Sequence, residues 1–101
     1  RILYNATYIN DAYSEKALEI LSRSKFSHGM RSVLIPGVKA SIKYGIASET
    51  YINNQLHECG IIYWQTNRPH VLCIMTIGDD YTQMATFIKD VTSAVQTAVM
   101  K

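Results

Sequence analysis

Two short groups of residues have side chains that could act together on a substrate. Lys43-Tyr44-Gly45 lies near the end of an alternating segment, and His57-Glu58-Cys59 begins the next one. An ammonium group fixed on a rigid strand can hold an anionic substrate, and a glycine lets that substrate lie close to the backbone. Taken alone, Lys43 is a solvated strand lysine like Lys39. The pattern indicates an anion-binding strand only if its surroundings support it.

The neighbouring titratable residues predict no metal site. His57 and Glu58 are adjacent, so a strand would place them on opposite faces, and the other histidines, His28 and His70, lie far away in sequence. We expect His57 to be partly buried on the face that also carries Cys59, and Glu58 to be a surface carboxylate. His57 stays a candidate substrate-binding residue because it is close to Cys59.

Serine and cysteine chemistry is not evident either. Ser22 stands three residues before Lys25, but this pair follows a predicted helix instead of opening one, so we interpret the spacing as chance. Cys59 and Cys73 have no metal-ligand spacing. We expect them to be small buried hydrophobic residues, and a disulfide would require the strand register to bring them together.

Three strands are predicted to position these residues. Alternation of apolar residues predicts a strand over 38–46, and two further strands are predicted over 57–64 and 71–77. The turn at 65–69 would join the last two strands as a hairpin. Residues 47–55 are polar and are expected to form a loop.

Helical patterns lie on both sides of the strands. Residues 1–8 are expected to end one helix, and Ser14 is the expected N-cap of the next, over 14–22. A short helical piece is predicted over 27–33. Asp80, with a glutamine three residues later, predicts the start of a last helix. The apolar stripe of that helix is Met84, Phe87, Ile88, Val91, Val95, Ala98 and Val99.

The fold class that follows is α+β. It is a three-stranded antiparallel meander with a C-terminal helix packed on it and N-terminal helices beside it. The 101 residues, 48% hydrophobic and 18% charged, fit one modest core. A net charge of +2 gives no basic surface for nucleic acid, and the apolar runs are too short to span a membrane.

The order of these segments resembles the C-terminal portion of a class A β-lactamase-like serine hydrolase, one of the penicillin-recognising serine enzymes. The resemblance rests most on residues 30–37, Lys43-Tyr44-Gly45, Gly60-Ile61-Ile62 and Thr76-Ile77-Gly78. It implies that residues 1–101 are a single partial domain, one wall of the cleft in a β-lactamase-like α/β sandwich. The nucleophilic Ser-x-x-Lys would then lie in a missing N-terminal half, supplied by the same or a separate chain.

The resemblance also implies roles for individual residues. Lys43 would hold the substrate anion and tune the proton relay around the serine. Gly45 would let the substrate lie against the strand, and the backbone N–H of Ile46 would contribute to the oxyanion hole.

Two residues depart from the family pattern. Tyr44 stands where the family usually has Thr or Ser, and Cys59 stands where penicillinases often carry an arginine that supports the substrate carboxylate. These departures imply a substrate pocket of changed shape, in which His57 is a candidate for the vacant cationic position.

The leading interpretation is a serine acyl hydrolase that acts on β-lactam or related amide or peptide substrates through an acyl-enzyme, with this chain alone inactive. It implies no cofactor and a secreted, periplasmic or cell-surface location, because family members act on cell-wall-type substrates outside the membrane. One alternative is a non-catalytic relative that serves as a binding or cell-wall-associated module. Another is an unrelated small α/β domain in which Lys-x-Gly is accidental.

Overall fold

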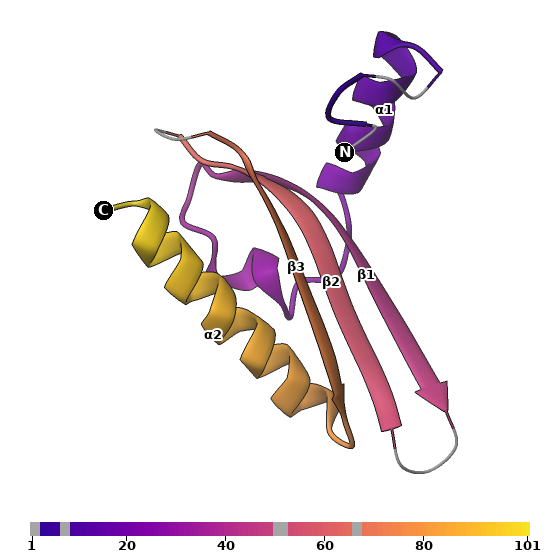
Figure 1. Cartoon of the computed structure of the whole chain (residues 1–101), viewed down its shortest axis with the longest axis vertical. Helices are drawn as coiled ribbons and strands as arrows, with labels where there is room; N and C mark the ends of the chain where they lie inside the picture. The colour runs from indigo at the N-terminus through magenta and orange to yellow at the C-terminus, as the bar shows by residue number, and fades with distance from the viewer. Residues whose placement is uncertain (1–2, 7–8, 50–52, 66–67) are drawn as a thin grey trace.

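The chain forms a three-stranded antiparallel sheet with a helix before it and a helix after it (Figure 1). The computed structural model describes residues 3–6, 9–49, 53–65 and 68–101. The elements in chain order are α1 (Asp11–Ser22), η1 (Met30–Val33), β1 (Lys39–Glu49), β2 (Asn53–Tyr63), β3 (His70–Gly78) and α2 (Tyr81–Val99). The strands lie in the order β1-β2-β3. This confirms the α+β meander predicted from the sequence.

Strands β1 and β2 are longer than predicted. Residues 47–49 and 53–55, expected to belong to a loop, continue the two strands, and Ala47 pairs with Gln55. Polar residues tolerate this arrangement because the paired backbones supply the hydrogen bonds while the side chains reach water. The turn predicted at 65–69 includes residues 66–67, which lie outside the described residues.

Helix α1 begins earlier than predicted. Asn10 is the N-cap, and its Oδ1 accepts a hydrogen bond from the Tyr13 N–H at 2.9 Å. Ser14, the expected cap, lies inside the helix with a buried side chain. Both residues are favoured N-cap types, so the local sequence allowed either start. Residues 3–6 form a turn and not the end of a helix.

Helix α2 begins where the sequence predicted. The Asp80 carboxylate accepts hydrogen bonds from the backbone N–H groups of Thr82 at 2.8 Å and Gln83 at 3.3 Å. These bonds satisfy two N–H groups that have no partner within the helix. Met84 and Ile88, one turn apart, are buried against the sheet. The cap and the apolar spacing together fix how α2 lies on the strands.

The core lies between α2 and one face of the sheet (Figure 1). Its buried hydrophobic side chains are Met30, Ala40, Ile42, Leu56, Ile62, Trp64, Ile74, Met84 and Ile88. Burial of each large aliphatic side chain contributes about 1.5–3 kcal/mol. Gly60 allows β1 to approach β2 closely, because a Cβ at Gly60 would lie 2.7 Å from the side chain of Ile42.

The opposite face of the sheet, here called the open face, is only partly covered: α1 lies over β1, and the turn at Leu3 and Tyr4 lies near Ile61 and Val71. The Ser41 hydroxyl donates to the carbonyl oxygen of Leu18 at 2.9 Å and ties α1 to this face. Farther along it, Val71, Met75 and Ile77 of β3 are 66%, 72% and 66% exposed. Exposed apolar side chains that gather on one face are typical of a surface that contacts another structural unit.

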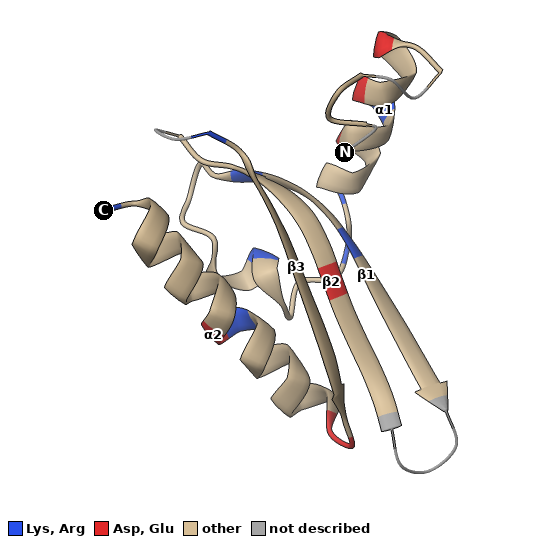
Figure 2. Ribbon diagram, in the orientation of Figure 1, with Lys and Arg blue, Asp and Glu red and all other residues tan. Residues whose placement is uncertain are grey.

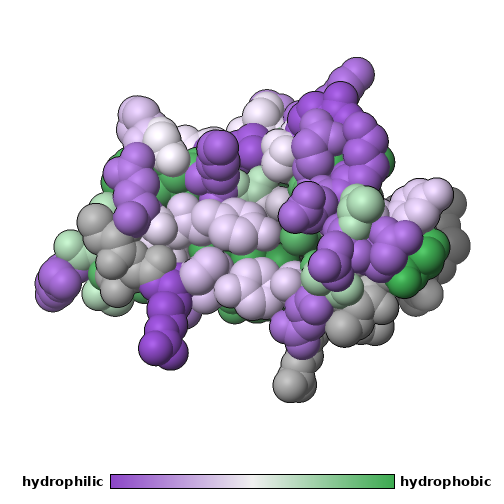
Figure 3. All heavy atoms as spheres, turned by 90° about the horizontal axis from the view of Figure 1, so that it is seen from above, coloured by the Kyte–Doolittle hydropathy of each residue, from purple (hydrophilic) through white to green (hydrophobic). Residues whose placement is uncertain are grey.

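The α2 side chains do not all join the core. Phe87, predicted to belong to the buried stripe, is 55% exposed and lies beside Met75 and Ile77 at the free edge of β3. Charged residues are few along the three strands (Figure 2). At the end of the molecule seen in Figure 3, hydrophilic residues surround small areas where hydrophobic residues show. No helix within the described ranges has the length and hydropathy needed to cross a bilayer.

Candidate functional site

Four of the six predicted site residues lie together on the open face. Lys43 pairs with Cys59, and Gly45 pairs with His57, across β1 and β2. Because successive residues of a strand point to opposite faces, these four positions are neighbours on one side of the sheet. They are called the Lys43 patch below. The strand register, which the sequence could not give, creates this patch.

Lys43 occupies an exposed position on β1, an edge strand of the described sheet. Its Nζ donates to the carbonyl oxygen of Tyr44 and lies 5.0 Å from the centroid of the Tyr44 ring. Within the described part of the chain, the ion pairs all involve Glu19, so no carboxylate there neutralises Lys43. The ammonium group is therefore available to an anion.

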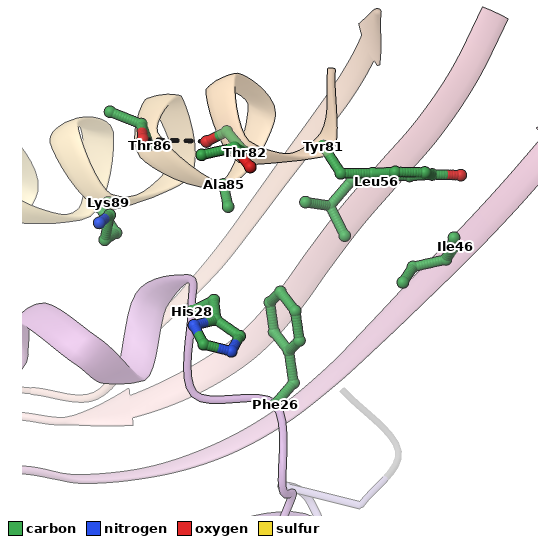
Figure 4. Close-up of a pocket in the computed structure, with 9 residues that line it drawn as sticks. All are labelled: Phe26, His28, Ile46, Leu56, Tyr81, Thr82, Ala85, Thr86 and Lys89. Carbon is green, nitrogen blue, oxygen red and sulfur yellow. Dashed lines mark hydrogen bonds between the residues drawn. The ribbon is translucent and has the colours of Figure 1, made fainter. Parts of the chain in front are cut away.

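Gly45 leaves open space beside the edge strand. A Cβ added at Gly45 would meet no other atom within 4 Å. A ligand can therefore approach the backbone at this point, as expected for a glycine that lines a binding site. The next residue, Ile46, directs its side chain away from the open face into a cavity beside Phe26 and Leu56 (Figure 4).

Tyr44 lies on the face opposite to the Lys43 patch. Its ring stacks on Phe26, with centroids 4.7 Å apart and planes inclined by 22°. Phe26 belongs to the segment between α1 and η1, which passes along this side of β1. The phenol is therefore held away from the open face, and Tyr44 borders the Lys43 ammonium with its ring and its carbonyl oxygen.

Cys59 and Cys73 form a disulfide, which corrects the expectation of two small buried hydrophobic residues. They are direct partners on β2 and β3, with Cα atoms 4.1 Å apart, and both are exposed. A slip of one residue in the register would put the two side chains on opposite faces, so sequence alone could not decide the pairing. Lys43, Cys59 and Cys73 therefore form one row of side chains across the three strands.

His57 is partly buried, as predicted, and both ring nitrogens have partners. Its Nδ1 accepts a hydrogen bond from the Thr76 N–H at 3.2 Å, and its Nε2 lies 2.9 Å from Oε1 of Gln55. The ring thus connects the Thr76 backbone of β3 with the Gln55 side chain of β2, and both of its nitrogens are engaged beside the patch.

Glu58 is fully buried, and the expectation of a surface carboxylate was wrong. Its exposed fraction is 0%, and its Oε1 accepts a hydrogen bond from the Met30 N–H at 2.8 Å. Its Oε2 has no partner among the described residues. Burial raises the pKa of this carboxyl group, and the Met30 hydrogen bond and the Arg31 charge oppose that rise.

A sequence signal for the burial of Glu58 existed. The alternation that places His57 and Cys59 on one face places Glu58 on the other, with Leu56 and Gly60. Glutamate is rarely buried without a partner, so the charge of Glu58 outweighed this alternation in the prediction of a surface position.

The described residues contain no group of three or more His, Cys, Asp or Glu side chains arranged to hold a metal ion. Ser22, the serine of the apparent Ser-x-x-Lys spacing, ends α1, and its hydroxyl donates to the Glu19 carbonyl at 2.6 Å. This position does not suit a nucleophile at the start of a helix.

The family model described as "Beta-lactamase enzyme family" matches residues 1–99. A class A β-lactamase from Bacteroides cellulosilyticus DSM 14838 has a TM-score of 0.80 and 13% identity, with 93% of this chain and 36% of that chain covered. PBP-A has a TM-score of 0.75 and 15% identity, with 96% and 35% covered. An ancestral (GNCA) class A β-lactamase has a TM-score of 0.74 and 14% identity, with 91% and 35% covered. No curated protein matches the sequence significantly.

The three structures share the fold of this chain, and the chain spans about a third of the length of each. The family match includes the whole sheet, the Lys43 patch and α2. The chain therefore belongs to the β-lactamase enzyme family.

Proposed function

We propose that residues 1–101 are the C-terminal part of a serine acyl hydrolase domain that acts on β-lactam or related amide or peptide substrates. The observation that carries the proposal is the pair Lys43 and Gly45, an un-neutralised ammonium beside open space on an edge strand. The matched structures are about three times as long as this chain, which leaves room for a nucleophilic serine in the rest of the domain.

In this proposal the rest of the domain supplies the nucleophilic serine, and this chain supplies the groups that bind the substrate anion and the oxyanion. The serine attacks the substrate carbonyl and forms an acyl-enzyme, which water then hydrolyses. Lys43 holds the substrate anion by a charge-assisted hydrogen bond. The Ile46 N–H, next to the open space at Gly45, donates to the oxyanion of the tetrahedral intermediate.

The changed residues restrict the substrate. Cys59 is bonded to Cys73 and carries no charge, and the Tyr44 hydroxyl lies on the other face. His57 is occupied by Thr76 and Gln55. Lys43 therefore holds the anionic group without the second cation or hydroxyl of a typical penicillinase. We expect the protein to discriminate less strongly than a typical penicillinase between substrates whose anionic groups lie at different positions.

The remainder of the domain is the proposed partner of the open face. Val71, Met75 and Ile77 present apolar surface there, and β3 is a sheet edge whose backbone groups can pair with a further strand. If the rest of the domain covers this surface, it buries the apolar side chains and supplies the wall of the cleft opposite Lys43.

A secreted, periplasmic or cell-surface location is part of the proposal. Disulfides persist mainly in oxidising compartments, and Cys59 and Cys73 form one.

The alternative is a non-catalytic binding or cell-wall-associated module. The observation that favours it is the combination of a bridged Cys59 and a Tyr44 turned away from the patch. Such a module would keep the scaffold and bind an anion at Lys43 without forming an acyl-enzyme.

The intact mass of the full-length protein, with and without benzylpenicillin, separates the two functions. An acyl hydrolase gains the mass of one penicillin, and protein that is denatured by heat before penicillin is added does not gain this mass. A full-length protein that never gains this mass, but whose NMR spectrum shifts on penicillin addition, supports the binding module.

A further inference from the structure

A cavity on the open face brings the Cys59–Cys73 bridge and Lys43 together. It has a volume of about 500 Å³ and lies between α1 and the three strands. Helix α1 contributes Leu18 and Leu21 to its lining, and the strands contribute Lys43 and both cysteines. A small molecule that enters this cavity therefore reaches both sulfur atoms of the bridge.

The two ends of the bridge have different electrostatic surroundings. Cys59 lies directly opposite Lys43, whereas the neighbours of Cys73 on the same face of β3 are the uncharged Val71 and Met75. A cation beside a cysteine favours its thiolate form. The thiol that ionises more readily is the better leaving group in disulfide exchange. Cys59 is therefore the sulfur that leaves more easily when the bridge is opened.

We propose that this row is a thiol-exchange site, at which a small dithiol opens the bridge and Lys43 then pairs with the Cys59 thiolate. The first thiolate of the dithiol attacks Sγ of Cys73. A sulfur–sulfur bond forms to Cys73, the bond between the two cysteines breaks, and Cys59 leaves as a thiolate. The second thiol of the dithiol loses its proton to water and attacks the dithiol's own sulfur in this mixed disulfide. Cys73 is released and takes up a proton, the dithiol becomes a cyclic disulfide, and its two electrons pass to the bridge.

Opening the bridge changes the charge around Lys43. In the closed state the cysteines are neutral, and Lys43 has no carboxylate partner among the described residues. In the open state the Cys59 thiolate supplies an anionic partner, so a substrate anion must compete for the ammonium group. This effect on substrate binding rests on the proposed function, but the exchange reaction itself does not.

The first test maps the exchange in the folded full-length protein. 2-Mercaptoethanol, a monothiol, performs only the first step, and iodoacetamide then labels the released thiol. We expect peptide mass mapping to find the mercaptoethanol adduct on Cys73 and the carbamidomethyl group on Cys59. Lys43→Met should reduce this preference about two- to fivefold, the effect of a solvated ion pair. Lys39→Met, which removes another exposed lysine of β1, is the matched control and should keep the preference.

Single-cysteine variants separate the effect of charge from that of access. In Cys73→Ser, the free Cys59 thiol should react with iodoacetamide about two- to fivefold faster than it does when Lys43→Met is added. In Cys59→Ser, Lys43→Met should not change the reaction rate of the free Cys73 thiol. The mapping on the wild-type protein remains informative if a cysteine variant does not fold.

The rate of acylation by penicillin tests the consequence for Lys43. Wild type treated with dithiothreitol should be acylated about two- to fivefold more slowly than the closed protein, because the thiolate competes for the ammonium group. The double variant Cys59→Ser, Cys73→Ser lacks both the bridge and the thiolate. It should be acylated faster than reduced wild type, an order that the loss of a purely structural bridge would not produce.

Three results would overturn the proposal. One is a bridge that resists mercaptoethanol in the folded full-length protein and opens only in urea. Another is an alkylation rate of Cys59 that Lys43→Met leaves unchanged. The third is equal acylation of reduced wild type and the double variant. Absence of acylation in every form would instead contradict the proposed function, because the mapping and alkylation results do not depend on penicillin.

Discussion

Lys43 and Cys59 lie directly opposite each other on β1 and β2, and Cys59 is bonded to Cys73 on β3. The row of side chains across the three strands therefore holds the Lys43 ammonium group followed by an uncharged disulfide. The resemblance to penicillinases would place a second cation at Cys59, and the bridge removes the free side chain from that position. In the proposed function, Lys43 is therefore the residue that holds the substrate anion in this row.

Replacement of Lys43 by alanine should lower the rate of acylation of the full-length protein by penicillin about 10- to 150-fold. The reason is the loss of a hydrogen bond from a charged donor, which contributes about 1.5–3 kcal/mol. Stopped-flow measurement with a fluorescent penicillin gives the second-order rate constant. Lys39→Ala, also exposed on β1, is the matched control and should acylate at the wild-type rate. Equal rates for all three proteins would remove Lys43 from the proposed mechanism.

Reduction of the Cys59–Cys73 bridge should lower the free energy of unfolding by about 3 kcal/mol, the entropy effect for a loop of this size. The two residues are 14 positions apart in sequence, so the bridge closes a short loop across the β2–β3 hairpin. Urea unfolding with and without dithiothreitol measures the change. The double variant Cys59→Ser, Cys73→Ser should be less stable and insensitive to dithiothreitol. A wild-type midpoint that does not respond to dithiothreitol would contradict a stabilising bridge.

Glu58 should make stability fall as the pH rises. Its folded pKa is raised above the ordinary value of 4.5, so the folded protein binds this proton more tightly than the unfolded chain does. Below pH 4.5 the group is protonated in both states; above it, stability decreases until the pH passes the raised folded pKa.

Glu58→Gln is the matched variant, because its amide oxygen can still accept the Met30 hydrogen bond and it does not titrate. As the pH rises from 4.5 to the raised folded pKa, we expect the unfolding free energy of wild type to fall relative to that of Glu58→Gln. Urea titrations from pH 4 to pH 8 measure it. A pH-independent difference, or a shift in favour of wild type, would show that the pKa of Glu58 is not raised.

Two glycines should respond differently to alanine. A Cβ at Gly29 would lie 2.1 Å from Oε1 of Glu58, whereas a Cβ at Gly45 meets nothing within 4 Å. Gly29→Ala should destabilise the protein by about 1–3 kcal/mol, the usual effect of overpacking. Gly45→Ala should change the free energy of unfolding by less than about 0.5 kcal/mol, as for other unobstructed surface changes.

Of the same two variants, Gly45→Ala should have the larger effect on acylation. Gly45→Ala places a methyl group where the substrate is proposed to lie, so it should slow acylation by penicillin without unfolding the protein. Unfolding curves and acylation rates on the same samples check both effects. Large destabilisation by Gly45→Ala would mean that the space beside Gly45 is filled in the full-length protein.

The sequence alone determined the elements that depend on local patterns. Alternation from residue 38 to residue 46 located β1, and Asp80 followed by an apolar spacing of three and four located α2. Short connections then required neighbouring strands to pair as a meander, so the order β1-β2-β3 followed as well. The grouping of Lys43 with Gly45 also came from one strand, because residues two apart share a face.

Only the tertiary structure decided the features that depend on contacts between distant residues. The register of β2 against β3 joined Cys59 to Cys73, and a slip of one residue would have separated them. Packing of η1 on the sheet gave Glu58 a buried partner at Met30, which its charge alone argued against. Ser14 was the expected cap of α1, but the structure has Asn10 as the cap and buries Ser14. In each case the deciding energy comes from groups that the chain brings together only when it folds, so no local pattern could contain it.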